Sequence, residues 1–116
     1  MQAENEITVA PTRDADFLRR WILRPAFVRK MGGVSGSRDV AIACDALLAS
    51  DARFFAVWVG VVEKGCVIFK RIADGWEMHL CLATFFTHTR TAVRLALAAL
   101  GAPVVANYPA SRRAVD

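Results

Sequence analysis

The sequence predicts an α+β domain built on a mixed β-sheet, and three segments support this fold class. Trp76–Leu82 alternates its side chains with the period of two that is typical of a half-buried strand. Thr91–Leu100 is rich in helix-forming residues and stops at Gly101, a residue type that commonly ends a helix. Arg53–Val62 is almost continuously apolar, as in a strand that is buried on both faces.

The N-terminal part predicts one strand and one helix. Glu6–Ala10 is a short strand that Pro11 closes, because proline cannot donate to a hydrogen-bonded ladder. Thr12 and Asp14 both offer side-chain oxygens that can cap the first turn of a helix. Pro25 is expected to end or kink this helix, because its ring clashes with the preceding turn.

The rest of the chain predicts a second helix, a meander and a crossover. Ser37 caps the second helix, and Glu63–Gly65 is expected to form a tight hairpin turn before a return strand at Cys66–Ile72. Ala73–Gly75 carries the Asp-Gly signal of a second hairpin, and Ala102–Tyr108 is expected to be the last strand. The predicted order is β-α-α-β-β-β-α-β, an antiparallel meander followed by a β-α-β crossover.

Composition indicates a single domain over residues 1–116, of which 55% are hydrophobic. The longest uncharged apolar run, Phe54–Val62, is nine residues long, whereas a membrane-spanning helix needs about 20. We therefore expect no membrane span. Met1–Glu6 is acidic and polar, the opposite of a signal peptide, so the expected location is cytoplasmic or within a larger assembly.

The net charge of +4 comes mainly from arginine and raises the question of nucleic-acid binding. No block of basic residues is longer than two, and no RNA-binding or zinc-finger signature is present. A nucleic-acid partner is therefore not expected. Contact with DNA through Arg112 and Arg113 is kept only as a third hypothesis.

The cysteines do not indicate a metal centre. Cys44, Cys66 and Cys81 are widely spaced, form no C-x-x-C pair, and accompany only two histidines in the whole chain. A structural zinc site needs four suitable ligands at close spacing. We therefore expect three buried, reduced thiols and no bound metal.

The order of elements, with two helices between the first and second strands, resembles the GNAT acetyltransferase fold. Phe54–Val62 and Cys66–Phe69 are similar to the family's second and third strands. Trp76–Leu80 is similar to the fourth strand, in a form close to that of small phage-encoded GNAT-like proteins, and Asn107–Ala114 is similar to the segment after the fifth. The resemblance covers nearly the whole chain and implies a shortened domain that lacks the family's C-terminal helix and last strands.

The resemblance also implies where a cofactor would bind. Family members hold the pyrophosphate of acetyl-CoA in a turn of the form Q/R-x-x-G-x-G/A after the fourth strand, where glycines let backbone N–H groups approach the phosphates. The best overlay puts Thr87 at the Q/R place, Arg90 at the first glycine and Ala92 at the last position, so only Ala92 fits. Phe85 and Phe86 add bulk at the same place. We therefore expect no cofactor.

Glu77 and His79 are the candidate catalytic residues. They lie two apart on one predicted strand, so their side chains share a face. The resemblance implies a general base at this place, with Glu77 in that role and His79 beside it. The alternative is a pair of polar side chains that satisfy each other, and the loss of the cofactor turn favours it.

Two main hypotheses follow. The first is a non-catalytic GNAT-like binding or structural module, phage-encoded, which docks through an exposed sheet edge onto itself or onto a virion or another assembly. The second is an N-acetyltransferase with an atypical turn that binds acetyl-CoA. Its cofactor-binding residues would be Thr87, Thr89, Arg90, Thr91 and Ala92.

Overall fold

The computed structural model describes residues 6–25, 27, 37–84, 86–102 and 104–107. The predictions for Phe85, Tyr108, Arg112 and Arg113 lie outside these residues. Along the described residues the elements are β1 (Ile7–Pro11), α1 (Ala15–Ile22), α3 (Ser37–Ala49), β2 (Arg53–Val59), β3 (Val62–Ile72), β4 (Gly75–Leu82), α4 (Thr89–Leu100) and β5 (Val104–Asn107). The predicted α+β class is confirmed.

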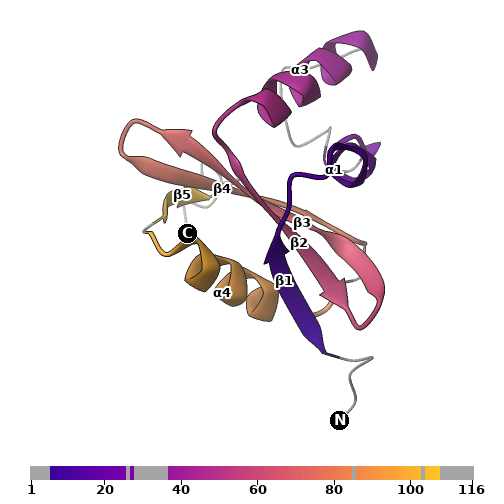
Figure 1. Ribbon diagram of the computed structural model, residues 1–116, viewed down its shortest axis with the longest axis vertical. Helices are drawn as coiled ribbons and strands as arrows, with labels where there is room; N and C mark the ends of the chain where they lie inside the picture. The colour runs from indigo at the N-terminus through magenta and orange to yellow at the C-terminus, as the bar shows by residue number, and fades with distance from the viewer. Residues whose placement is uncertain (1–5, 26, 28–36, 85, 103, 108–116) are drawn as a thin grey trace.

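The described strands form one open sheet in the order β1-β2-β3-β4-β5. The pairs β1/β2, β2/β3 and β3/β4 are antiparallel, and β4/β5 is parallel because α4 carries the chain back between them. Figure 1 shows α4 on one side of the sheet and α1 with α3 on the other. No helix in the described part of the chain is both long and apolar enough to cross a lipid bilayer.

Each face of the sheet has its own buried cluster, because successive strand residues point to opposite faces. The α4 face comprises Phe55, Val57, Val67, Phe69, Trp76, Met78, Ala92, Ala96 and Leu100. The α1/α3 face comprises Phe17, Leu18, Trp21, Ile22, Phe27, Cys44, Ala52, Phe54, Ala56, Cys66, Ile68 and Cys81. β2 supplies both clusters, which confirms a strand buried on both faces at Phe54–Val57, but the strand ends at Val59 and not at Val62 as predicted.

The start of α1 follows from its capping residue. Asp14 is the N-cap, and its Oδ1 accepts hydrogen bonds from the backbone N–H groups of Asp16 and Phe17 at 3.1 and 3.2 Å. Thr12, the other predicted cap, instead accepts a hydrogen bond from the N–H of Asp14 through its Oγ1. The helix ends at Ile22, before Pro25 is reached.

The predicted hairpin turn at Glu63–Gly65 is wrong, because these residues lie inside β3. The chain turns instead at Gly60 and Val61, where Gly60 has a φ of 59°. Gly65 has a φ of 134°, and a Cβ there would collide with the carbonyl oxygen of Cys81 on β4. Glycine is therefore required at position 65 for the close approach of two strands rather than for a turn.

The crossover helix begins two residues earlier than predicted. α4 starts at Thr89 with His88 as N-cap, and His88 makes no side-chain capping hydrogen bond. Its end is as predicted: Gly101 takes the left-handed conformation at a φ of 69°, and its N–H donates to the carbonyl of Leu97 at 3.1 Å.

Candidate functional site

The predicted pair Glu77 and His79 lies on β4 and is joined by a hydrogen bond. Glu77, His79 and Cys81 stand at alternate positions of β4, so their side chains point to the same face of the sheet. Cys81 belongs to the buried cluster of the α1/α3 face, so Glu77 and His79 point to that face as well. His79 Nε2 is 2.9 Å from Glu77 Oε1, and the two side chains are 20% and 31% exposed, respectively. The two candidate catalytic residues therefore contact each other directly, in a sheltered position that some water still reaches.

The N-terminus of α4 is where the predicted cofactor turn lies. The N–H of Ala92 donates to the carbonyl of His88 at 3.0 Å, so this amide is used within the helix. The amides of Thr89, Arg90 and Thr91 precede the first bonded position and have no carbonyl partner in the helix. The Ala92 side chain is fully buried against the sheet. Among the described residues, the amides of Thr89, Arg90 and Thr91 thus have no hydrogen-bond acceptor, unlike that of Ala92.

Aromatic side chains stand beside these amides. The rings of Phe86 and His88 contact each other edge to face, with centroids 5.9 Å apart. Phe86 packs against the buried cluster on the α4 face, and its N–H donates to the carbonyl of Ala83 at 3.1 Å. Two aromatic rings therefore stand in the chain segment that leads into the helix.

The structure does not bring the predicted base and the predicted turn to the same face. On β4 the side chains of Trp76, Met78 and Leu80 pack toward α4, whereas Glu77 and His79 point away from it. Any molecule bound at the N-terminus of α4 would have to reach past the edge of β4 to meet the Glu77 carboxylate.

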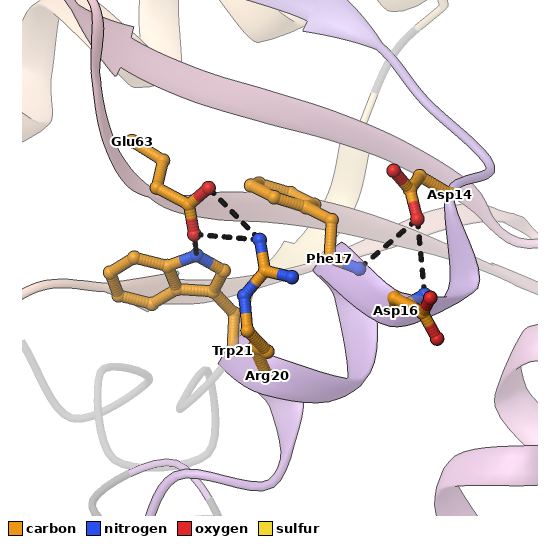
Figure 2. Close-up of polar contacts among 6 residues, drawn as sticks. All are labelled: Asp14, Asp16, Phe17, Arg20, Trp21 and Glu63. Carbon is orange, nitrogen blue, oxygen red and sulfur yellow. Dashed lines mark hydrogen bonds and ion pairs between the residues drawn. The ribbon is translucent and has the colours of Figure 1, made fainter.

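A second polar cluster, which the sequence did not predict, joins α1 to β3. The Glu63 carboxylate accepts a hydrogen bond from Trp21 Nε1 at 2.8 Å. It also accepts from one guanidinium nitrogen of Arg20, at 3.1 Å to Oε1 and 3.0 Å to Oε2. Figure 2 shows the carboxylate lying between the indole and the guanidinium group. The Glu63 side chain is only 29% exposed, so this carboxylate holds α1 onto the sheet.

This cluster borders a surface pocket of about 410 Å³ between α1 and the β1–β2 edge. Phe17 and Trp58 form its aromatic wall, with ring planes 9° apart and centroids 6.4 Å apart. The lining residues are Ala10, Pro11, Thr12, Asp14, Phe17, Arg20, Ala56, Trp58 and Glu63. The pocket therefore combines flat aromatic surface with charges of both signs.

No local sequence signal could have found this cluster. Glu63 is separated from Trp21 and Arg20 by 42 and 43 residues, and the turn prediction had assigned it to a hairpin tip. Only the correct register of β3, which places Glu63 opposite Trp58, reveals that it faces α1.

The three cysteines are free and buried, as predicted, and they lie together on the α1/α3 face. Cys66 and Cys81 are directly opposite each other on β3 and β4, and Cys81 Sγ donates to the carbonyl of Trp21 at 2.7 Å. The hydrogen bond to Cys81, followed by burial, raises the pKa of the Cys66 thiol well above its usual value. Burial also raises the pKa of Cys44. The thiols of Cys44 and Cys66 are therefore held protonated at neutral pH.

Within the described residues, no three side chains of histidine, cysteine, aspartate or glutamate are grouped so that they could hold a metal ion. Comparison of the chain with protein-family models, with curated proteins and with solved structures finds no match.

Proposed function

We propose that this chain is a GNAT-like domain that serves as a binding or structural module rather than as an enzyme. The arrangement of a crossover helix between two parallel strands, beside an antiparallel meander, supports the proposal. The side chains at the N-terminus of α4 favour a binding module over an enzyme.

The observation that carries the proposal is the entrance to α4. The connection from Ala83 to Arg90 contains no glycine, and the rings of Phe86 and His88 pack against each other there. A diphosphate binds a helix N-terminus through close contact with the main chain, which small residues allow and rings prevent. The absence of small residues at this place supports the proposal that coenzyme A does not bind there.

The proposed docking surface is the edge of the sheet at β5. Among the described strands β5 is the last, and its ladder with β4 runs only from Trp76 to Met78. Strand edges carry backbone donors and acceptors that a second strand can pair with. We propose that the partner is another copy of this chain or a component of a larger assembly. The resemblance to phage-encoded proteins makes a virion the assembly proposed.

A second candidate function is acetyl-CoA-dependent N-acetyl transfer, which the Glu77–His79 pair favours. Their 2.9 Å hydrogen bond orients the carboxylate. In this alternative Glu77 takes the proton that the acceptor amine loses. The free amides of Thr89, Arg90 and Thr91 would hold the diphosphate.

Calorimetric titration of the purified chain with acetyl-CoA separates these functions. The binding-module proposal expects no heat of binding that depends on Arg90 at the N-terminus of α4. Micromolar binding that Arg90→Glu abolishes, while Arg94→Glu on an exposed face of the same helix leaves it intact, would replace the proposal with the transferase.

Light scattering over a wide range of protein concentration tests the docking edge. Self-association is the expected result for the purified chain. If the chain is a monomer at every concentration, a second copy is not the partner. The proposal then requires that the chain co-elute with a protein of the virion.

A further inference from the structure

A pocket of about 340 Å³ lies at the end of the sheet where β1 finishes and β2 begins. It is lined by Pro11, Thr12, Arg13, Arg53, Phe54, Phe55 and Ala99. Ala99 belongs to the last turn of α4, so this pocket is at the opposite end of that helix from the N-terminal amides. It is therefore separate from the place where the family resemblance puts a cofactor.

Two arginines at this end share one aromatic ring. The Cζ of Arg53 is 5.7 Å and the Cζ of Arg71 is 4.9 Å from the centroid of the Trp76 ring. Trp76 is 8% exposed, so its indole is a fixed surface on which both guanidinium groups rest. Two cations are thus held near each other on neighbouring strands.

These cations have no carboxylate partner in the described part of the chain. The ion pairs there join Arg19 to Asp45, Arg20 to Glu63 and His79 to Glu77. Asp51 and Asp74 lie near the same end of the sheet but are exposed and form no ion pair with Arg53 or Arg71. Like charges held together repel each other, and a bound anion would relieve that repulsion.

Arg13 adds a third guanidinium group that is fixed in place. It donates to the carbonyls of Leu48, Ser50 and Ala52, at 3.1 Å in the case of Leu48, and its Cζ lies 5.0 Å from the Phe54 ring centroid. Because these hydrogen bonds already fix the Arg13 side chain, ligand binding costs no further side-chain entropy at this residue.

The dipole of α4 disfavours an anion at this end of the helix, so its partial charge must be compared with the charges of the side chains near the pocket. The C-terminal end of α4 carries a partial charge equivalent to about −0.5 of a unit charge. Arg13, Arg53 and Arg71 bring three positive charges to the same end of the sheet, against the two carboxylates of Asp51 and Asp74, so the positive charges still outnumber the negative ones. The local field is therefore positive.

We propose that this pocket binds a small phosphate-bearing ligand of nucleotide size. Guanidinium groups match the geometry of phosphate oxygens and bind them through paired hydrogen bonds. Arg53 lines the pocket and contacts the phosphate, with Arg71 beside it. Pro11 and Ala99, which are exposed, provide apolar surface for the organic part of the ligand.

The test is calorimetric titration with ADP and with pyrophosphate, and with adenosine as the probe that lacks phosphate. ADP and pyrophosphate are expected to bind and adenosine is not. Arg53→Glu and Arg71→Glu should each weaken binding at least about tenfold, because each removes a charge-assisted contact. Arg53→Lys and Arg71→Lys keep the positive charge and should weaken ligand binding less. They also show whether the loss of binding in the glutamate variants comes from the charge rather than from misfolding.

Arg24→Glu is the matched control. The Arg24 guanidinium lies 3.7 Å from the Trp21 ring centroid on the other face of the sheet, so the variant makes the same charge change in the same kind of contact. It should leave binding unchanged. An equal loss in Arg24→Glu, binding of adenosine as tight as that of ADP, or no binding of ADP and pyrophosphate would each overturn the proposal. Binding only to a DNA duplex, with no response to Arg53→Glu, would overturn it as well.

Discussion

On the α4 face every buried side chain is hydrophobic, whereas the α1/α3 face also buries three thiols and holds the Glu63 carboxylate beneath α1. Ala92 and Ala96 are fully buried under α4, and their small size lets the helix lie close to the sheet. The buried cluster of the α4 face is therefore held by hydrophobic packing. The α1/α3 face combines packing with polar contacts, and the Glu77–His79 pair points to it.

This difference indicates how the two layers are attached. α4 is connected to its strands by a short crossover and by hydrophobic contact along its length. α1 is held in part by hydrogen bonds to one carboxylate, that of Glu63. Polar contacts of this kind are more sensitive to charge and pH than hydrophobic burial is.

The largest expected effect is on the α4 face. Phe69 is fully buried there, so Phe69→Ala should lower the free energy of unfolding by about 3 to 5 kcal/mol. Urea denaturation measures it. Val61→Ala, at a side chain that is 88% exposed, should change it by less than about 0.5 kcal/mol. A cost for Phe69→Ala near that of Val61→Ala would show that the α4 face does not carry the stability.

The next effect concerns the backbone beneath the cysteine pair. Gly65→Ala puts a Cβ against the Cys81 carbonyl at a φ of 134°, and it should cost about 2 to 4 kcal/mol. Gly101→Ala is the matched control: its φ is 69° and no atom lies within 4 Å of the added Cβ, so about 1 kcal/mol is expected. Equal costs in thermal unfolding would contradict the close approach of β3 and β4.

The Glu63 contact is expected to contribute less. Glu63→Ala leaves the buried indole N–H of Trp21 without its acceptor, and it should cost about 1 to 3 kcal/mol. Glu63→Gln keeps an acceptor oxygen and loses only the ion pair with the exposed Arg20, so it should cost less than about 1 kcal/mol. Tryptophan fluorescence during unfolding reports both. The reverse order would mean that charge, rather than the indole contact, holds α1.

The smallest effect at neutral pH is that of the thiols. The pKa of Cys66 is raised in the folded state above its usual value of 9.0, so the protonated thiol favours folding. This contribution is fully present below the unfolded pKa and is lost as pH rises through the folded one. Stability should therefore fall above about pH 9, with a slope of up to about 1.4 kcal/mol per pH unit.

Cys66→Ala removes this titration, so its stability should depend less on pH between about pH 9 and 11 than that of the parent chain. Denaturant unfolding at a series of pH values measures the slope. Parallel curves for the two proteins would show that Cys66 does not bind its proton more tightly when folded.

The sequence predicted those elements whose signals are local. The cap at Asp14, the helix end at Gly101 and the doubly buried strand at β2 each depend on a few neighbouring residues. The hairpin was misplaced because Gly60 and Gly65 both fit a turn, and the apolar Val61 and Val62 hid the true one.

The candidate site was less predictable. The two-residue period of a strand predicts that Glu77 and His79 lie side by side, and their hydrogen bond confirms it. The Glu63 cluster and the shared ring of Trp76 depend on strand register and on residues far apart in the chain, which no local pattern encodes.

Arg13 gives the α1/α3 layer a common anchor. Its guanidinium group ties the segment that enters α1 to the carbonyls of Leu48, Ser50 and Ala52, where the chain leaves α3. The way into the first helix and the way out of the second are therefore fastened at one point. Backbone amides of both helices should exchange with deuterium in step, and a change of this one side chain should loosen the entire layer while α4 keeps its protection.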